Sequence, residues 1–198
     1  MDDKKSMVKN YARRRIEYLE SETNRSLVRA DLANLRRGIG KKPGELPELW
    51  ELLFREFPEE LMSSNAEPTW AEWAVSGALT LYALHMQGAG QTAHKEGQRL
   101  GIAIGRLTKN DADRLKAVQR RFNAFATSKS MPECMHHLRG LVQLLHSEDI
   151  PMDYVELAGD LYDFQTPDGA AKIRLRWGQD FYRNTILKEE SEEKNNGK

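Results

Sequence analysis

The chain has 198 residues, of which 39% are hydrophobic and 30% are charged, and its 30 basic side chains are balanced by 30 acidic ones. This composition is typical of a globular protein and excludes a chain that is disordered throughout. The single cysteine, Cys134, excludes a disulfide framework. No apolar run is long enough for a signal peptide or a membrane span, so we expect a soluble, cytoplasmic protein.

The charges are sorted along the chain into four blocks of alternating sign. Residues 4–42 contain 12 bases and 4 acids, and residues 45–72 contain 8 acids and a single base. Residues 106–139 then contain 8 bases and 3 acids, while residues 148–168 contain 7 acids and no base. The zero net charge therefore hides a surface with separate positive and negative patches, if the helices keep the blocks apart.

Apolar residues that recur every three or four positions predict a succession of helices and no sheet. In chain order, the expected helices lie around residues 1–20, 26–37, 47–57, 70–87, 100–107, 111–127, 131–145, 154–162 and 173–187. The segment 172–177 also alternates like a strand. Phe181 continues the four-residue step of Ile173 and Trp177, however, and this favours a helix.

Several helix starts are marked by residues that can cap them. Thr69 with Glu72, and Ser130 with Glu133, have the spacing of a capping box, in which each side chain accepts the backbone N–H of the other residue. Further N-terminal signals, from a side-chain oxygen or from proline, are Ser26, Pro47, Asn110 or Asp111, and Asp153. These signals support an all-α fold.

The helices are expected to form two small bundles. The weakest link between the two halves is the polar stretch 108–110, which predicts an N-terminal helical domain at 1–108 and a C-terminal helical bundle at 109–187. Residues 188–198 are charged and polar without an apolar period, so we expect a disordered tail. The predicted fold is all-α, with roughly nine helices in two domains and no sheet.

The glycine-rich turn after the second helix resembles a nucleotide-binding motif only in part. Gly40 and Lys41 fit the end of a phosphate loop, but that motif needs a glycine where this chain has Leu35. It also needs serine or threonine after the lysine to bind magnesium, where this chain has Lys42. A flexible basic loop is the better interpretation.

Metal-binding and nucleophilic motifs are missing as well. The five histidines and Cys134 form no Cys-x-x-Cys pair and no His-Glu-x-x-His motif. No neighbouring base marks the thiol as a nucleophile. Gly97, Gly101 and Gly105 are spaced four apart, which indicates close helix packing rather than ligand binding. We therefore expect no catalytic residues, no metal site and no cofactor.

Basic residues on defined helical faces are the strongest functional feature. Opposite or beside the apolar side of the helix 111–127 stand Arg114, Lys116, Arg120 and Arg121. The next helix carries a column of possible donors formed by His136, Arg139, Gln143 and His146. Such donors suit phosphate oxygens, to which arginine offers a bidentate fork.

The glycine-rich turn carries a second group of bases, which consists of Arg36, Arg37, Lys41 and Lys42. Contact of these groups with phosphate would be independent of sequence and sensitive to salt. The same patches can pair with acidic protein surfaces, and arginines at a helix C-terminus also complement the helix macrodipole. From the residues alone, nucleic acid and protein are equal alternatives as partners.

Six runs of sequence occur in an order and spacing that point to one family. In the first half they are LANLRRGIGKKPGELPELW (32–50) and LGIAIGRL (100–107). In the second half they are RRFNAFATS (120–128), HHLRGLVQLL (136–145), IPMDYVELAGDLYDFQ (150–165) and RLRWGQDFY (174–182). Over most of its length the chain resembles the CasB family, the small subunit of the type I-E CRISPR surveillance complex Cascade.

The resemblance implies two helical domains and no enzymatic activity. It implies that the chain pairs with a second copy inside an RNA-guided complex, beside the subunits that hold the guide RNA and the large subunit that helps to recognise target DNA. A basic face is expected to hold target DNA, including the displaced strand, and so to stabilise the R-loop. Cleavage would belong to a separately recruited nuclease-helicase.

Transferred to this sequence, the resemblance implies a nucleic-acid-binding face on both halves of the chain. Its ten residues are Arg36, Arg37, Lys41, Lys42, Arg106, Arg114, Arg120, Arg121, Lys129 and Arg139. The expected partners are target DNA and guide RNA, the other Cascade subunits and a second copy of the chain, with no membrane. The alternative is a purely structural bridge between proteins in the complex, without direct DNA contact.

Overall fold

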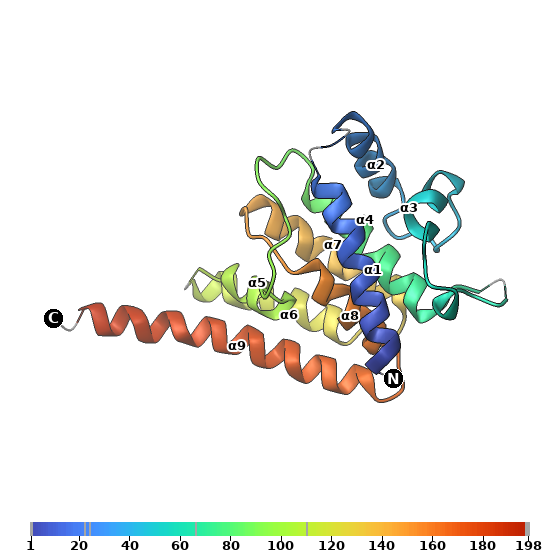
Figure 1. Cartoon of the computed structure of the whole chain (residues 1–198). Coiled ribbons are helices and arrows are strands. Elements are labelled where there is room, and N and C mark those ends of the chain that lie inside the picture. The colour runs from blue at the N-terminus through green and yellow to red at the C-terminus, as the bar shows by residue number, and fades with distance from the viewer. Residues whose placement is uncertain (1, 22, 24, 66, 110, 197–198) are drawn as a thin grey trace.

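The computed structural model describes residues 2–21, 23, 25–65, 67–109 and 111–196, with side chains from Asp3 to Thr185. Within these residues the chain forms nine α-helices, two 3-10 helices and no sheet, which confirms the expected all-α class (Figure 1). In chain order the elements are α1 (Asp2–Glu20), α2 (Arg25–Arg37), η1 (Pro47–Leu49), α3 (Trp50–Phe54), η2 (Glu59–Leu61), α4 (Trp70–His85), α5 (Leu100–Arg106), α6 (Ala112–Ala126), α7 (Met131–Ser147), α8 (Tyr154–Phe164) and α9 (Gly169–Asn196).

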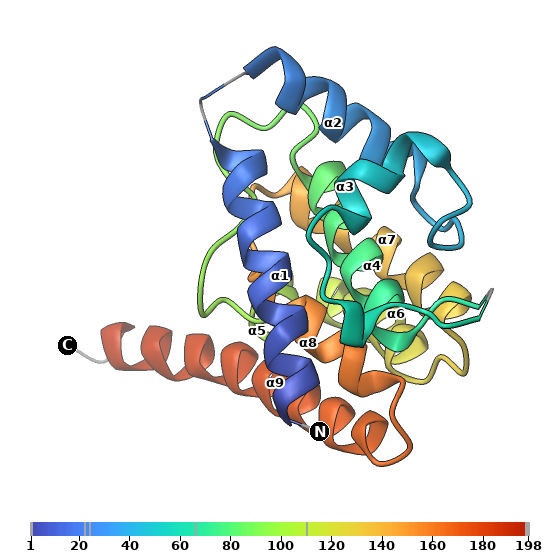
Figure 2. The ribbon, with the colours of Figure 1, turned by 45° about the vertical axis from the view of Figure 1, so that its right-hand side comes forward.

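Helix α4 lies at the centre of the fold. Fourteen of its residues are buried, and α1, α2, α7 and α8 all pack against it (Figure 1, Figure 2). Its small side chains let the neighbouring helices approach closely. A Cβ placed on Gly77 would lie 2.9 Å from the sulfur of Met135 on α7. A helix that is apolar on all sides is buried on all sides, as is expected for the core of a helical protein.

The predicted caps begin four of the helices. At α4, Glu72 N donates to Thr69 Oγ1 at 3.1 Å and Thr69 N donates to Glu72 Oε2 at 2.6 Å, which completes the capping box. The side chains that accept a backbone N–H at the starts of α6, α7 and α8 are those of Asp111, Ser130 and Asp153. The capping box expected at α7 is only half formed, because the Glu133 carboxylate accepts Lys129 N at 2.8 Å instead of Ser130 N. These starts are therefore encoded locally, by one or two polar side chains each.

Two local expectations were wrong, and one falls outside the described residues. Helix α2 begins at Arg25, so Ser26 lies inside the helix and is not its cap. Pro47 begins a 3-10 turn, and the short helix α3 turns Trp50 outward, where 52% of its surface is exposed and its indole donates to Gly44 O at 2.9 Å. Asn110, the alternative cap of α6, lies outside the described residues.

Glycine allows α5 to lie directly against α9. A Cβ on Gly101 would lie 2.5 Å from Trp177 O, and a Cβ on Gly105 would lie 3.0 Å from Phe181 O. This confirms that these two glycines serve helix packing. Gly97 does not share their face, because it lies in the turn before α5 with a φ of 75°, a conformation that favours glycine. The segment 172–177 is helical, as expected.

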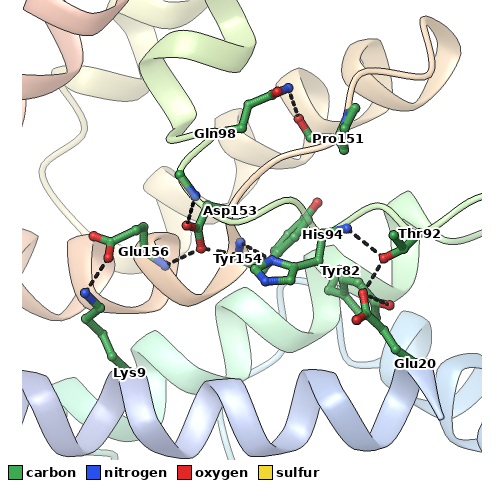
Figure 3. Close-up of polar contacts among 11 residues, drawn as sticks. Lys9, Glu20, Tyr82, Thr92, His94, Gln98, Pro151, Asp153, Tyr154 and Glu156 are labelled. Carbon is green, nitrogen blue, oxygen red and sulfur yellow. Dashed lines mark hydrogen bonds and ion pairs between the residues drawn. The ribbon is translucent and has the colours of Figure 1, made fainter.

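The loop between α4 and α5 is fixed to the start of α8, as Figure 3 shows. Asp153 accepts from Gly97 N at 2.7 Å and from Glu156 N at 2.9 Å. His94 Nδ1 accepts from Tyr154 N at 3.2 Å. These bonds join the first half of the sequence to the second.

Buried apolar side chains from Val8 to Phe181 form one cluster, which includes residues on both sides of the stretch 108–110. The division into domains at 1–108 and 109–187 stays a prediction. Helix α9 continues to Asn196 and so includes most of the segment 188–198 that was expected to be a disordered tail. The side chains of that segment lie outside the described residues, and the tail also stays a prediction.

Candidate nucleic-acid interface

The four basic candidates of the first half have partners within the fold. The ion pairs are Arg37–Glu48 at 2.9 Å, Lys41–Glu45 at 2.7 Å and Lys42–Glu67 at 2.7 Å. Arg36 is partly buried and donates to Ala83 O at 3.4 Å. The acids come from the block 45–72, so the first two charge blocks neutralise each other in part. Each ion pair is at least partly exposed, and such pairs stabilise a protein by at most about 1 kcal/mol.

Two further basic candidates, one on each side of the stretch 108–110, also have partners. Arg106 donates to the side-chain oxygen of Gln98. Arg114 forms an ion pair with Glu148, which also binds Lys109. The hydrogen bonds from Lys109 and Arg114 lower the pKa of Glu148. Glu148 begins the second acidic block, so opposite blocks meet here as well.

The remaining four candidates have exposed side chains without a partner among the residues that the structure describes. They are Arg120, Arg121, Lys129 and Arg139. All four belong to α6, α7 or the loop between these helices. Because Arg114 near the start of α6 contacts Glu148 at the end of α7, the two helices are antiparallel. The fold therefore places these four candidates on one helix pair.

Aromatic packing fixes the orientation of α6. The ring centres of Phe122 and Phe181 are 5.3 Å apart, and those of Phe125 and Trp177 are 4.6 Å apart. Both partners belong to α9. Since successive helical residues are separated by about 100° around the axis, Arg120 points away from Phe122 and into solvent. The aromatic contacts thus hold the basic side of α6 outward.

Helix α7 presents a shorter column of donors than expected. His146 is partly buried, and its Nδ1 lies 2.9 Å from His85 O, so it fixes α7 to the end of α4. His136, Arg139 and Gln143 are exposed. The predicted column of four donors is therefore corrected to three.

The basic turn after α2 lies against α4, at a crevice that one residue of α7 also reaches. Gly38, Gly40 and Lys41 line the same narrow crevice as Met135. Met135 and Arg139 are four residues apart and therefore share one face of α7. Met135 is buried whereas Arg139 is exposed, so the crevice relates the turn to α7 through its buried residue.

Two exposed bases on α9 were not among the candidates. Lys172 and Arg183 have no partner in the described part of the chain. Their positions beside the apolar steps of α9 could have identified them as exposed. Arg174 has a structural role instead, because its Nε donates to Ala126 O at 2.5 Å and its guanidinium lies 5.3 Å from the ring centre of Phe164.

Two buried titratable groups, Cys134 and His85, are held in their neutral forms. Burial raises the pKa of the Cys134 thiol to about 12, which disfavours the nucleophilic thiolate. Burial also lowers the pKa of His85 to about 4, and its Nδ1 lies 2.9 Å from the hydroxyl of Tyr154. Among the described residues, no three His, Cys, Asp or Glu side chains are grouped to hold a metal ion. No helix in the same residues is long and apolar enough to cross a membrane.

Comparisons with known proteins agree with this helical arrangement. Residues 31–182 match the family described as CRISPR-associated protein Cse2. A search among curated proteins gives no match. Similar solved structures include CasB from Thermobifida fusca, which is 31% identical with a TM-score of 0.74, over 88% of this chain and 97% of that chain.

Two further structures are similar over most of their length. CasB from M. ruber is 26% identical with a TM-score of 0.67, over 91% of this chain and 97% of that chain. The Cse2-family protein from Thermus thermophilus is 22% identical with a TM-score of 0.65, over 86% and 97%, which supports the fold alone. Because the family match spans most of the sequence and the Thermobifida structure is similar across nearly its whole length, this chain belongs to the CRISPR-associated Cse2 family, that of the CasB proteins.

Proposed function

We propose that this chain is the non-catalytic small subunit of a type I-E Cascade complex in the cytoplasm. It binds target DNA, including the strand that the guide RNA displaces, and so stabilises the R-loop during antiviral defence. Its partners are target DNA, the guide RNA, the other Cascade subunits and a second copy of the chain.

The unpaired bases on α6 and α7 are the observation that carries this proposal. A base that is already exposed and unpaired can contact phosphate without first losing an ion pair. Arg120, Arg121 and Arg139 each offer a guanidinium, which can bind phosphate through two hydrogen bonds. Holding a displaced strand requires charge and reach along the backbone rather than contacts to base edges.

The paired bases of the first half make a secondary contribution to DNA binding. Exposed ion pairs are weak, so DNA phosphate can replace a carboxylate at Arg37, Lys41 or Lys42 at little cost. Lys41 and Met135 of α7 line one crevice, which supports a strand path that reaches from the turn toward α7. We expect these residues to act mainly when the assembled complex brings DNA close to them.

The test removes three unpaired arginines together, by Arg120→Ala, Arg121→Ala and Arg139→Ala. A plot of log K for single-stranded DNA against log salt has a slope whose magnitude is about 0.7 per phosphate contact. Removal of three contacts should therefore reduce the magnitude of this slope by about 2. Fluorescence anisotropy with single- and double-stranded DNA, from roughly 50 to 200 mM salt, measures this slope. The melting temperature should not change, because all three side chains are exposed.

A matched control removes the same charge elsewhere, by replacing the exposed residues Arg13, Arg14 and Lys95 with alanine. The control should keep more of the DNA affinity than the α6–α7 variant at every salt concentration. Unchanged DNA binding by the α6–α7 variant, both alone and in the complex, would show that the site is assigned wrongly. Loss of assembly before any loss of DNA would favour the alternative, a structural bridge without direct DNA contact.

A further inference from the structure

Exposed apolar side chains are concentrated in the acidic block 45–72. The described chain has six large apolar side chains that are well exposed, and three of them belong to this block. They are Trp50, Met62 and Trp70, which are 52%, 39% and 43% exposed. Exposed tryptophan and methionine beside charged residues are typical of protein–protein contact surfaces.

Two of these side chains line one hollow. Met62 and Trp70 border a space of about 360 Å³ between η2 and the start of α4, which we call the acidic hollow. Tyr162 of α8 also lines it and meets Trp70 edge to face, with ring centres 6.4 Å apart. Glu60 and Lys4 lie at its border. The space suits one aliphatic or aromatic side chain with part of its backbone.

The wall of the hollow is held by the cap of α4. Glu72, which is only 9% exposed, accepts Ser63 N at 3.1 Å as well as Thr69 N at 2.6 Å. Thr69 Oγ1 also donates to Leu61 O at 2.8 Å. One buried carboxylate therefore fixes both ends of the segment between η2 and α4. A surface that is already ordered loses less entropy on binding a partner.

The acids of the block are only partly neutralised, and one of those left over, Glu60, lines the hollow. Four of the eight pair with bases, namely Glu45, Glu48, Glu51 and Glu67. Glu72 is the buried cap. The other three are exposed without a partner among the described residues, and they are Glu56, Glu59 and Glu60. Glu60 lines the hollow and Glu59 precedes it, whereas Lys4 also lines it, so a small negative excess remains. Such an excess repels phosphate and attracts a basic protein surface.

We propose that the acidic hollow docks a basic segment from another protein subunit of the complex. An aliphatic or aromatic side chain of that segment fills the space between Met62 and Trp70. Lysine or arginine residues flanking this anchor form ion pairs with Glu59 and Glu60. The inference rests on the proposed function, because the partner is sought among the Cascade subunits that assemble with this chain.

The anchor contact is tested with Met62→Ala and Trp70→Ala together, in Cascade reconstituted from its own subunits. Buried aromatic anchors are the usual hot spots of interfaces, so the apparent affinity of this chain for the rest of the complex should fall about 30-fold or more. Leu27→Ala, another well-exposed apolar residue, is the control and should assemble normally. Circular dichroism confirms that each variant is folded.

The charged contact is tested by reversal and by crosslinking. Glu59→Lys with Glu60→Lys should weaken assembly and slow association, whereas Glu17→Lys, at an exposed acid on α1, should have little effect. A zero-length carbodiimide reagent, which joins carboxylates to lysines in contact, should link Glu59 or Glu60 to a lysine of another subunit. The link should be lost with the Met62 and Trp70 variant.

The outcomes separate this inference from the proposed function. If the unaltered chain does not assemble with the other subunits, the proposed function itself fails. If it assembles and both hollow variants assemble equally well, with no crosslink to another subunit, only the docking proposal is overturned. Trp70 also borders a hollow lined by Lys129 and Arg174. Weaker binding of single-stranded DNA by Trp70→Ala, with normal assembly, would overturn docking in favour of strand contact.

Discussion

The contact between α5 and α9 gives a sharp test of the packing, through Gly101→Ala. The new methyl group would lie 2.5 Å from Trp177 O and 2.7 Å from Asp180 Cβ, both on α9. Ordinary van der Waals contact begins near 3.4 Å, so the two helices must separate by roughly 1 Å. The obstacle is a backbone oxygen, which cannot rotate away as a side chain could.

Overpacking of this kind costs about 1–3 kcal/mol, while alanine gains up to about 1 kcal/mol over glycine in a helix. We therefore expect a net loss of about 1–2 kcal/mol, which lowers the melting temperature of a domain of this size by roughly 2–8 °C. Urea unfolding followed by circular dichroism and tryptophan fluorescence measures the loss.

Gly140→Ala on α7 is the matched control, because a Cβ there meets nothing within 4 Å. It should stabilise the protein by up to about 1 kcal/mol. The two substitutions are chemically identical, so only the packing around them differs. Equal effects of the two on the free energy of unfolding would refute the close approach of α5 and α9.

Two buried groups give further predictions. The pKa of His85 is lowered to about 4 by burial, so the folded protein holds it neutral while the unfolded chain binds a proton near pH 6.5. Stability should be unaffected above that pH and fall by about 3 kcal/mol between pH 6.5 and 4, and His85→Gln should flatten this part of the urea-midpoint profile. Cys134, buried and with its pKa raised to about 12, should react with a thiol reagent at pH 8 only after denaturant is added. Rapid reaction of Cys134 in the native protein would contradict its burial. Parallel pH profiles of the unaltered protein and the His85→Gln variant would contradict the lowered pKa of His85.

Local signals in the sequence predicted most of the fold. The periodicity of apolar residues predicted the helices, and the starts of α4, α6, α7 and α8 follow from caps that involve neighbouring residues only. The prediction failed where local signals compete. Ser26 can cap a helix or lie within its first turn, and spacing alone does not distinguish these. The helix expected at 47–57 is divided into the 3-10 turn η1 and the short helix α3, a break that the spacing of apolar residues does not reveal.

The candidate site was predicted only as a set of bases, because pairing depends on contacts distant in the sequence. Lys42 meets Glu67, 25 positions away, and Arg114 meets Glu148, 34 positions away. Neither contact leaves a periodic signal. The spacing of His146 likewise places it in the donor column. Its contact with His85 O arises only because α4 packs on α7, so the sequence does not predict it.

The functional importance of the alternating charge blocks lies in the charged side chains that stay unpaired after the blocks meet in the fold. Acids from the block 45–72 neutralise bases of the turn after α2, and Glu148 neutralises bases near the start of α6. A positive remainder stays on α6 and α7, and a negative remainder stays at residues 56–60. These remainders have opposite sign, belong to different elements and share no residue. A chain of zero net charge can thus present one surface to phosphate and another to a basic protein, and the docking proposal can fail while DNA binding by α6 and α7 stands.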